Sequence, residues 1–328
     1  MHAFDFAAPA KLDQVVRAAG PGSAFLAGGT TLVDLMKLSV LQPQHILDIN
    51  GVEGAPMRGI RPGRDGLSIG ALERMSDVAD DPFVSRAYPV VAQALLQSAS
   101  PQLRNMASIG GNLLQRTRCG YFRDVTTPCN KREPGSGCPA RTGDNRTHAI
   151  LGGSPACIAT HASDVAVAFV ALDASIRLIG RGGARTVRLA DFYRTPGSAP
   201  DVENELLPGE LIAEVVLPWL EWARLSAYVK VRDRASYEFA LTSAAVALDI
   251  QGGVVRDARI AVGGVGTVPW RLPAVESALR GKPATLDSFE VAAKSATEGA
   301  EPLAQNGFKV TLLQRTIVRA LAGLVGVR

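Results

Sequence analysis

The sequence has few aromatic residues and no apolar run long enough to cross a lipid bilayer. Phe, Trp and Tyr make up 5% of the chain, which argues against the base-stacking surface that single-stranded nucleic acid needs. The longest apolar run, Val165–Leu172, ends at Asp173, so no transmembrane helix is predicted. The N-terminal stretch lacks a basic start followed by a long apolar segment. From its own sequence we expect a cytoplasmic chain, with export on the signal of a partner subunit left open.

The chain also has little net charge outside one segment. Its formal charge is +4, and residues 115–157 alone carry seven Lys or Arg against three Asp or Glu, again a net of +4. A basic patch confined to one glycine- and proline-rich loop favours a bound anion over a nucleic-acid surface. With 328 residues, 47% of them hydrophobic, the chain is long enough to form two or three subdomains.

Cysteine is scarce, and all four cysteines fall in that same basic loop. Cys119, Cys129, Cys138 and Cys157 are separated by nine, eight and eighteen intervening residues. Nothing marks a secreted chain, so disulfides are disfavoured, and zinc ribbons usually present cysteines two to four residues apart. The wide gaps favour a large iron–sulfur cluster, whose negative charge the arginines and loop amides would offset. Structural zinc and a solvated loop with incidental cysteines remain the alternatives.

Three short segments have the residues of a dinucleotide site. Helical spacing over 11–19 and a strand over 23–27 lead into Gly28-Gly29-Thr30-Thr31, after which a helix is predicted over 32–38. A second glycine pair, in 108–112, follows a helical run over 88–98. A glycine pair lets backbone amides approach a phosphate, although each pair alone also fits an ordinary helix-entry turn. In the third segment, 161–164, Asp164 could bond a ribose hydroxyl or cap a helix.

One further glycine motif is set aside. Residues 264–269 begin like a dinucleotide-binding turn, but Pro269 stands where the last glycine is needed. We expect a structural loop there. The histidines match no nucleophile or zinc-protease pattern, so no catalytic histidine is predicted.

The glycine and acidic segments together resemble a known family. Residues 27–32, 108–112 and 163–166 have the order and spacing of the three FAD-contact motifs in the flavin subunit of the xanthine dehydrogenase family of molybdenum hydroxylases. Residues 214–218, 228–232 and 260–265 resemble its C-terminal domain, so the resemblance spans nearly the whole chain. It implies an α+β fold with a two-subdomain FAD-binding region of the vanillyl-alcohol-oxidase-like type, followed by a C-terminal sheet-and-helix domain. The implied boundaries are 1–221 (subdomains of about 1–55 and 56–221, the second with the cysteine loop 115–157) and 222–328.

The same resemblance assigns roles to individual residues. It implies that the two glycine segments cradle the FAD pyrophosphate, that Asp164 contacts the adenosine part, and that Lys230 lies near the isoalloxazine. Ile212 would pack on the flavin side of the site, and His161 could touch the cofactor. The implied FAD-binding residues are Ala27, Gly28, Gly29, Thr30, Thr31, Leu32, Ser108, Ile109, Gly110, Gly111, Asn112, His161, Asp164, Ile212, Lys230, Tyr237, Glu238 and Phe239.

The cysteine loop distinguishes this chain from most of the family. Residues 118–124 and 129–138 resemble the branch whose flavin subunit holds an additional 4Fe-4S cluster, above all bacterial three-subunit molybdenum aldehyde oxidoreductases. The resemblance implies that the four cysteines ligate that cluster. It also implies partner subunits, a large one with the molybdenum cofactor and a small one with 2Fe-2S clusters. Substrate chemistry would occur on the large subunit, and electrons would leave through FAD to an external acceptor.

Other functions stay open at this point. The chain could instead be the flavin subunit of a hydroxybenzoyl-CoA-reductase-like enzyme or of a xanthine or N-heterocycle dehydrogenase. A zinc-stabilised binding or assembly protein without flavin is the alternative from a different class.

Overall fold

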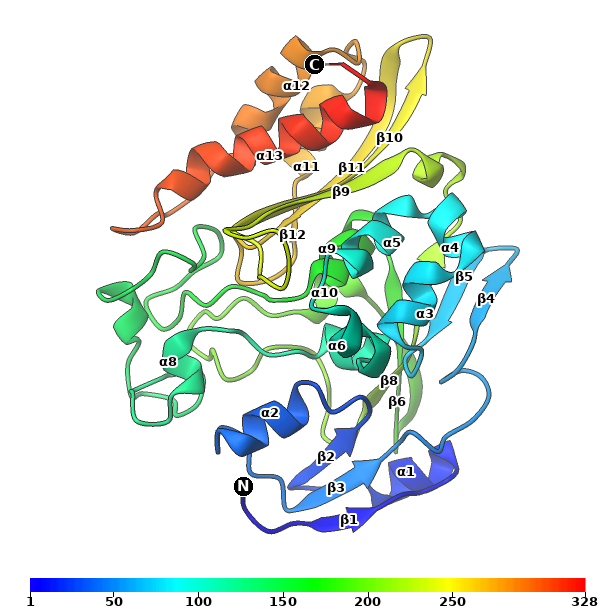
Figure 1. The fold of residues 1–328 in the computed structure, drawn as a ribbon, viewed down its shortest axis with the longest axis vertical. Coiled ribbons are helices and arrows are strands. Elements are labelled where there is room, and N and C mark those ends of the chain that lie inside the picture. Colours follow the sequence, from blue (N-terminus) through cyan, green and yellow to red (C-terminus); the bar gives the residue numbers. More distant parts are fainter. Residues whose placement is uncertain (328) are drawn as a thin grey trace.

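The computed structural model describes residues 1–327, and three sheets follow one another along its longest axis in chain order (Figure 1). The N-terminal sheet lies at one end, a five-stranded sheet with most of the short helices lies in the middle, and the C-terminal sheet with its helices lies at the other end. One small parallel sheet and two antiparallel sheets stand with helices packed on them, which confirms the predicted α+β class. No helix within these residues is both long and apolar enough to span a membrane.

The N-terminal sheet is small and parallel, with strand order β1-β3-β2. The predicted helix over 11–19 and strand over 23–27 are confirmed as α1 and β2, each ending one residue or so earlier than expected. Val15 and Val16 of α1 are buried and belong to a hydrophobic cluster that also holds residues from the middle sheet, so the two sheets share a core. The elements are β1 (Asp5–Ala7), α1 (Leu12–Ala18), β2 (Ser23–Leu26), α2 (Leu32–Lys37) and β3 (His45–Asp48).

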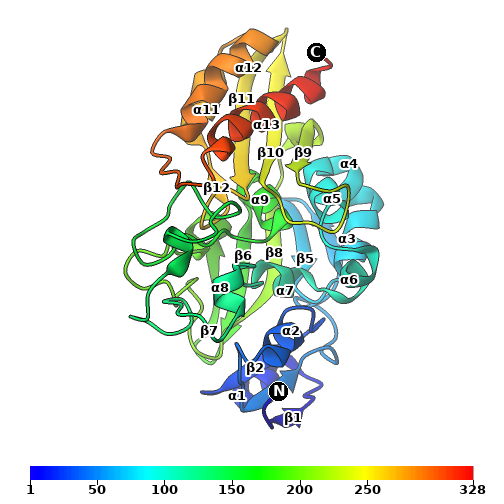
Figure 2. The ribbon, with the colours of Figure 1, turned by 60° about the vertical axis from the view of Figure 1, so that its left-hand side comes forward.

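The middle sheet is antiparallel, with order β4-β5-β8-β6-β7, and Figure 2 shows β5, β8 and β6 side by side. Its core lies between the sheet and helices α3, α5 and α9, and it includes the whole apolar run that the sequence contains at 165–172. The strands are β4 (Ile60–Gly63), β5 (Gly66–Gly70), β6 (Ser175–Gly180), β7 (Gly183–Arg188) and β8 (Leu211–Pro218). The helices are α3 (Met75–Asp80), α4 (Pro82–Ala87), α5 (Pro89–Leu96), α6 (Pro101–Met106), α7 (Ile109–Leu113), α8 (Gly120–Arg123), α9 (Asp164–Ala171) and α10 (Leu189–Phe192).

The C-terminal sheet is antiparallel, with order β12-β11-β10-β9, and it joins two cores. Ala245 and Ala247 of β10 face the core of the middle region, whereas Ala244, Val246 and Leu248 face the core under α11–α13. Small side chains on the first face let helices α5 and α9 approach the sheet closely. The elements are η2 (Glu221–Arg224), β9 (Ser226–Val231), β10 (Thr242–Gln251), β11 (Val254–Gly263), β12 (Trp270–Arg271), α11 (Pro273–Leu279), α12 (Leu286–Ala293), η3 (Lys294–Thr297) and α13 (Phe308–Val325).

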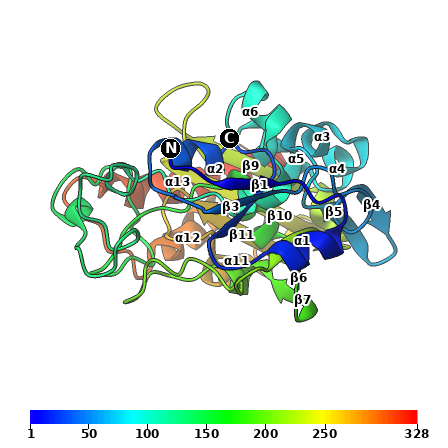
Figure 3. The same cartoon turned by 90° about the horizontal axis from the view of Figure 1, so that it is seen from below.

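The cysteine loop runs from the end of α7 to the start of α9 and has little regular structure. Over that stretch the chain forms α8 and the short 3-10 turn η1 (Pro139–Arg141). Seen from below, this green segment extends to one side of the molecule (Figure 3). Hydrogen bonds from Lys131 to the Pro200 carbonyl and from Lys309 to the Thr147 carbonyl tie the loop to neighbouring parts of the chain.

Candidate functional site

Two connected cavities form a groove between the N-terminal sheet, the middle region and the C-terminal sheet. Their volumes are about 490 Å³ and about 170 Å³, and Thr30, Thr31 and Gly111 line both. The larger volume lies in the range of small-molecule sites. The smaller cavity is lined by Phe25, Ala27, Gly28, Gly29, Thr30, Thr31, Leu32, Leu41, Ser108, Gly111, Leu114 and Arg116. The larger also holds Asp34, Asn112, Arg118, Arg123, Asp164, Lys230, Tyr237, Glu238 and Phe239.

The first glycine segment packs directly on the chain that leads into the second. A Cβ atom at Gly28 would lie 2.0 Å from the carbonyl oxygen of Met106, so only glycine permits this approach. Gly29 has φ +72°, a left-handed conformation that other residues adopt at a cost. Arg74 donates to the same Met106 carbonyl and to Asn50, which fixes the junction further. The fold therefore brings the two predicted glycine segments together.

The second glycine segment is the start of α7, and its two glycines differ in role. Ser108 caps the helix by accepting a hydrogen bond from Gly111 N–H at 3.2 Å. Gly110 donates to the Ala71 carbonyl at 2.8 Å, and a Cβ atom at this position would lie 2.9 Å from the Ala71 side chain, so Gly110 packs against the chain at Ala71. A Cβ on Gly111 would meet only the Ser108 hydroxyl, and Gly111 lines both cavities. Gly111 is thus the glycine of this pair that faces the groove, while Ile109 is buried in the core.

The third segment caps α9 and carries a buried carboxylate. Ser163 accepts a hydrogen bond from Ala166 N–H and donates to Asn112 at 2.5 Å, so it links the second segment to the third. Asp164 is the first residue of the helix rather than its cap. Its carboxylate accepts hydrogen bonds from Lys230 Nζ at 2.8 Å and from the Tyr228 hydroxyl at 2.7 Å.

The contact between Asp164 and Lys230 places both residues at one end of the groove. Both side chains are nearly inaccessible, with 8% and 1% of their surface exposed. The resemblance had assigned them to opposite parts of FAD, and a pair in direct contact cannot lie at both ends of an extended dinucleotide. Burial, followed by the nearby Asp164 carboxylate, raises the pKa of Tyr228 well above its usual value, so its hydroxyl remains a donor.

The predicted aromatic and acidic residues 237–239 line the same end of the groove. Tyr237 has φ +53° and is 55% exposed, and Phe239 lies under the Arg118 guanidinium at 5.2 Å from the ring centre. Arg118 belongs to the cysteine loop, so that loop forms part of the groove wall. Arg123 of the same loop pairs with Asp34 at 2.8 Å.

Two predicted residues lie elsewhere. Ile212 in β8 is 3% exposed and belongs to the core of the middle region, so the structure does not bring it to the groove as expected. His161 lines an adjoining cavity of about 160 Å³ together with Asp164 and Phe239. Its ring meets the edge of Tyr193 at 4.5 Å, and burial lowers its pKa to about 4.

The four cysteines are free thiols that line one small cavity inside their loop. Burial raises the pKa of Cys119 to about 11 and also raises the pKa of Cys138 and Cys157, so each is a neutral thiol without a bound group. His148 Nε2 lies 3.2 Å from the Cys119 sulfur. Within residues 1–327, no three His, Cys, Asp or Glu side chains are arranged around a single ion.

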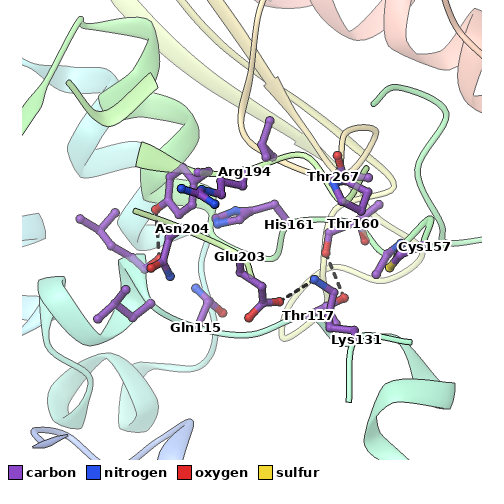
Figure 4. Close-up of a pocket in the computed structure, with 16 residues that line it drawn as sticks. Gln115, Thr117, Lys131, Cys157, Thr160, His161, Arg194, Glu203, Asn204 and Thr267 are labelled. Carbon is purple, nitrogen blue, oxygen red and sulfur yellow. Dashed lines mark hydrogen bonds and ion pairs between the residues drawn. The ribbon is translucent and has the colours of Figure 1, made fainter. Parts of the chain in front are cut away.

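Sequence reasoning missed the acidic residue that anchors this loop. Glu203 pairs with Arg116 at 2.6 Å and with Lys131 at 2.8 Å beside a cavity of about 40 Å³, and Figure 4 shows its carboxylate directed at Lys131. Burial opposes ionisation, but the two cations hold the pKa of Glu203 below its usual value. Nothing local to Glu203 in the sequence indicated this role, because its partners are distant along the chain.

A buried lysine of the C-terminal domain holds the other side of the loop and was also missed. Lys309 Nζ donates to the carbonyl oxygens of Thr147, His148 and Gly264 at 2.9, 3.0 and 2.6 Å. Its side chain is fully buried with no carboxylate partner among the described residues, and burial lowers its pKa to about 7. The loop at Gly264 is structural, as its sequence predicted, and it provides one of these acceptors.

Comparison with known proteins identifies the family of the chain that forms this groove. Residues 2–220 match the model of the FAD binding domain in molybdopterin dehydrogenase, and residues 226–324 match the CO dehydrogenase flavoprotein C-terminal domain. The chain belongs to this family. It is an oxidoreductase subunit of the molybdenum hydroxylases, and the predicted family and fold are confirmed.

Individual relatives cover almost the whole chain. The aldehyde oxidoreductase FAD-binding subunit PaoB of Escherichia coli is 48% identical over 92% of this chain and 91% of its own. The glyceraldehyde dehydrogenase medium chain of Sulfolobus acidocaldarius is 30% identical over 78% of this chain and 73% of its own. Carbon monoxide dehydrogenase from Hydrogenophaga pseudoflava contains a chain of the same fold, with a TM-score of 0.76, 26% identity, and 99% of this chain and 98% of that chain covered.

Proposed function

We propose that this chain is the FAD- and 4Fe-4S-containing electron-transfer subunit of a molybdenum-dependent oxidoreductase that converts aldehydes to carboxylic acids. The observation that carries the proposal is the cavity lined by four cysteines, which lies beside the groove lined by the glycine segments. The aldehyde-oxidising names of two relatives, one 48% and one 30% identical, support the substrate class.

The groove fits an extended dinucleotide. The glycine segments would hold the pyrophosphate in the smaller cavity, where Gly29, Gly111 and the hydroxyls of Thr30 and Thr31 lie. The isoalloxazine would occupy the larger cavity beside Lys230 and Phe239. Because Asp164 contacts Lys230, we place Asp164 at this end too. When bound, FAD exchanges two electrons and so couples one-electron carriers to a two-electron acceptor.

The chemistry of the donors around the cysteine cavity suits an anionic cluster. Four thiols face one space, and burial raises the pKa of Cys119, Cys138 and Cys157. Backbone amides of Tyr121, Phe122, Ile158 and Ala159 lie close enough to oppose part of that rise. Lys131 lines the cavity and adds positive charge. These donors would offset the negative charge of a cysteine-bound 4Fe-4S centre.

We also propose that the chain works in an assembly with other subunits. Substrate would be oxidised on a large molybdenum-cofactor subunit, and a small 2Fe-2S subunit would carry electrons to this chain. The term medium chain in the names of several relatives supports such an assembly. We retain domains of 1–221, with subdomains that meet near residue 55, and 222–328. A cytoplasmic location also remains part of the proposal, as does co-export with a partner.

Rapid mixing of the assembled complex with an aldehyde tests this function. We expect the flavin absorption to bleach before an external acceptor is reduced, and acceptor reduction to fail when FAD is removed from this chain. Lys230→Met should lower the flavin potential, because a cation near the ring favours anionic reduced flavin. Acceptor reduction at an unchanged rate without flavin would contradict the proposal.

A further inference from the structure

His148 lies directly beside the cysteine cavity, and any role for it toward a cluster depends on the proposed function. The residue belongs to the cysteine loop and is 5% exposed. Its Nε2 atom is 3.2 Å from the Cys119 sulfur, a hydrogen-bonding distance for sulfur. Among the described residues, no other side-chain nitrogen forms a hydrogen bond with a cysteine sulfur.

The surroundings of the ring decide which nitrogen carries the proton. Nδ1 is buried and has no hydrogen-bond partner among the described residues. A thiolate on Cys119 would repel a lone pair on Nε2 and attract a proton there, because anionic sulfur accepts but does not donate hydrogen bonds. The tautomer with Nε2–H is therefore the one that suits a ligated Cys119. This tautomer leaves Nδ1 as an unpaired acceptor. The alternative tautomer would leave an unpaired N–H at Nδ1 and would also turn the Nε2 lone pair toward the sulfur, which costs more.

The C-terminal domain holds this ring in place. The His148 carbonyl oxygen accepts hydrogen bonds from Lys309 Nζ at 3.0 Å and from Asn306 Nδ2 at 3.3 Å. The side chain of Tyr121 packs near the ring, with centres 6.4 Å apart. A ring fixed by its own backbone and by a neighbouring aromatic keeps its distance to the sulfur, so the contact is built into the fold.

Cys119 is also the cysteine that lies toward the groove. Cys119 and His148 line the adjoining cavity together with Asp164 and Phe239, residues that also line the groove. The preceding residue, Arg118, packs over Phe239. A donor at this sulfur would act on a bound cluster through the ligand that lies toward the groove.

We propose that His148 is a positioning residue that donates Nε2–H to the cluster-bound sulfur of Cys119 and thereby raises the reduction potential of the cluster. A hydrogen bond to a cysteine sulfur stabilises the reduced cluster more than the oxidised one, because the reduced cluster has one more negative charge. Electrons arriving from a partner subunit would then find a more favourable acceptor next to FAD.

The test compares two variants of the purified subunit by redox titration followed with electron paramagnetic resonance. His148→Leu removes the donor, and we expect reduction of the cluster to become about tenfold less favourable, a shift of about 59 mV for one electron. His148→Gln can place an amide N–H near the former Nε2 position and should restore most of the potential. Equal potentials in wild type and His148→Leu, with the cluster retained in both, would overturn the proposal.

Cluster loss gives an equally clear outcome. Loss from His148→Leu with retention in His148→Gln supports the donor role, whereas loss from both assigns His148 to packing alone and overturns it. Hyperfine spectroscopy of wild-type protein with isotope-labelled histidine needs no substitution, and it should detect a histidine nitrogen coupled to the reduced cluster. A wild-type chain without iron would refute the proposed function instead, so the two failures are distinguishable.

Discussion

The groove and the cysteine loop are built in opposite ways. The groove side chains satisfy one another: Asp164 pairs with Lys230, Ser108 caps α7, and Ser163 caps α9. In the loop, regular structure is sparse, and buried thiols with raised pKa values face a shared cavity. We therefore expect the groove to fold without its cofactor and, under the proposed function, the loop to depend on its bound cluster for full stability.

The largest effect should come from removing a cluster ligand. Cys157→Ser should reduce iron from about four atoms per chain to near zero and speed amide exchange across the cysteine loop, because cluster binding and loop order are coupled. Amide exchange in α7 and α9 and FAD content should stay close to wild type. Val125→Ser, at an exposed position of the same loop, is the control. Unfolding of the groove along with the loop would refute the comparison.

The next effect should come from breaking the ion pair of the groove. Lys230→Met leaves Asp164 as a buried carboxylate without its cation, and we expect the free energy of unfolding to fall by about 3 kcal/mol. Urea denaturation of the flavin-free protein measures this. The double variant with Asp164→Asn should recover more than half of the loss, since it removes the stranded charge. Lys294→Met, at an exposed position, should change little; an equal loss there would contradict the assignment.

Alanine substitutions separate the glycines that the fold needs from those that a cofactor needs. Gly28→Ala would force a methyl group against the Met106 carbonyl and should destabilise the chain by about 1–3 kcal/mol. Gly111→Ala would place a methyl group 2.9 Å from the capping Ser108 hydroxyl, so we expect a loss of at most about 1 kcal/mol, which the helix preference of alanine partly offsets. Because Gly111 lines both cavities, FAD content should fall. Full FAD content in Gly111→Ala would count against the placement of the pyrophosphate.

The smallest expected effect is a pH dependence of the free energy of unfolding that arises from Lys309, the buried lysine that holds the cysteine loop. Burial lowers the pKa of Lys309 to about 7 from 10.5. Between these values the unfolded chain binds a proton that the folded chain has released, so the Lys309 contribution to the free energy of unfolding rises with pH. The free energy of unfolding of wild type minus that of Lys309→Met should rise by at most about 1.4 kcal/mol per pH unit from pH 7 to 9, measured by urea denaturation. A flat difference would show that the ammonium stays charged throughout.

Local sequence patterns predicted the parts of the site that depend on consecutive residues. The glycine pairs and the clustered cysteines each require neighbours along the chain, and the fold brings both glycine segments to the groove. The helix start at 164 was also indicated, but its cap is Ser163 rather than Asp164. Predicted helix boundaries were accurate to within about two residues where glycine or proline bounds the element, as at α1, which ends before Gly20, and α5, which begins at Pro89.

Pairings between distant residues could not be predicted. Asp164 and Lys230 are 66 positions apart, and their contact depends on how α9 packs against the C-terminal sheet. An isoleucine suits either a flavin contact or a hydrophobic core, and only the register of β8 places Ile212 in the core. Glu203 and Lys309 are ordinary charged residues in sequence, and only burial shows their roles.

Iron and acid-labile sulfide analysis of the purified chain, with flavin quantified in the same sample, tests the central claim most directly. The account predicts about four irons and four sulfides per chain together with one FAD. A preparation with full FAD but zinc in place of iron, or with four unligated cysteines, would contradict it.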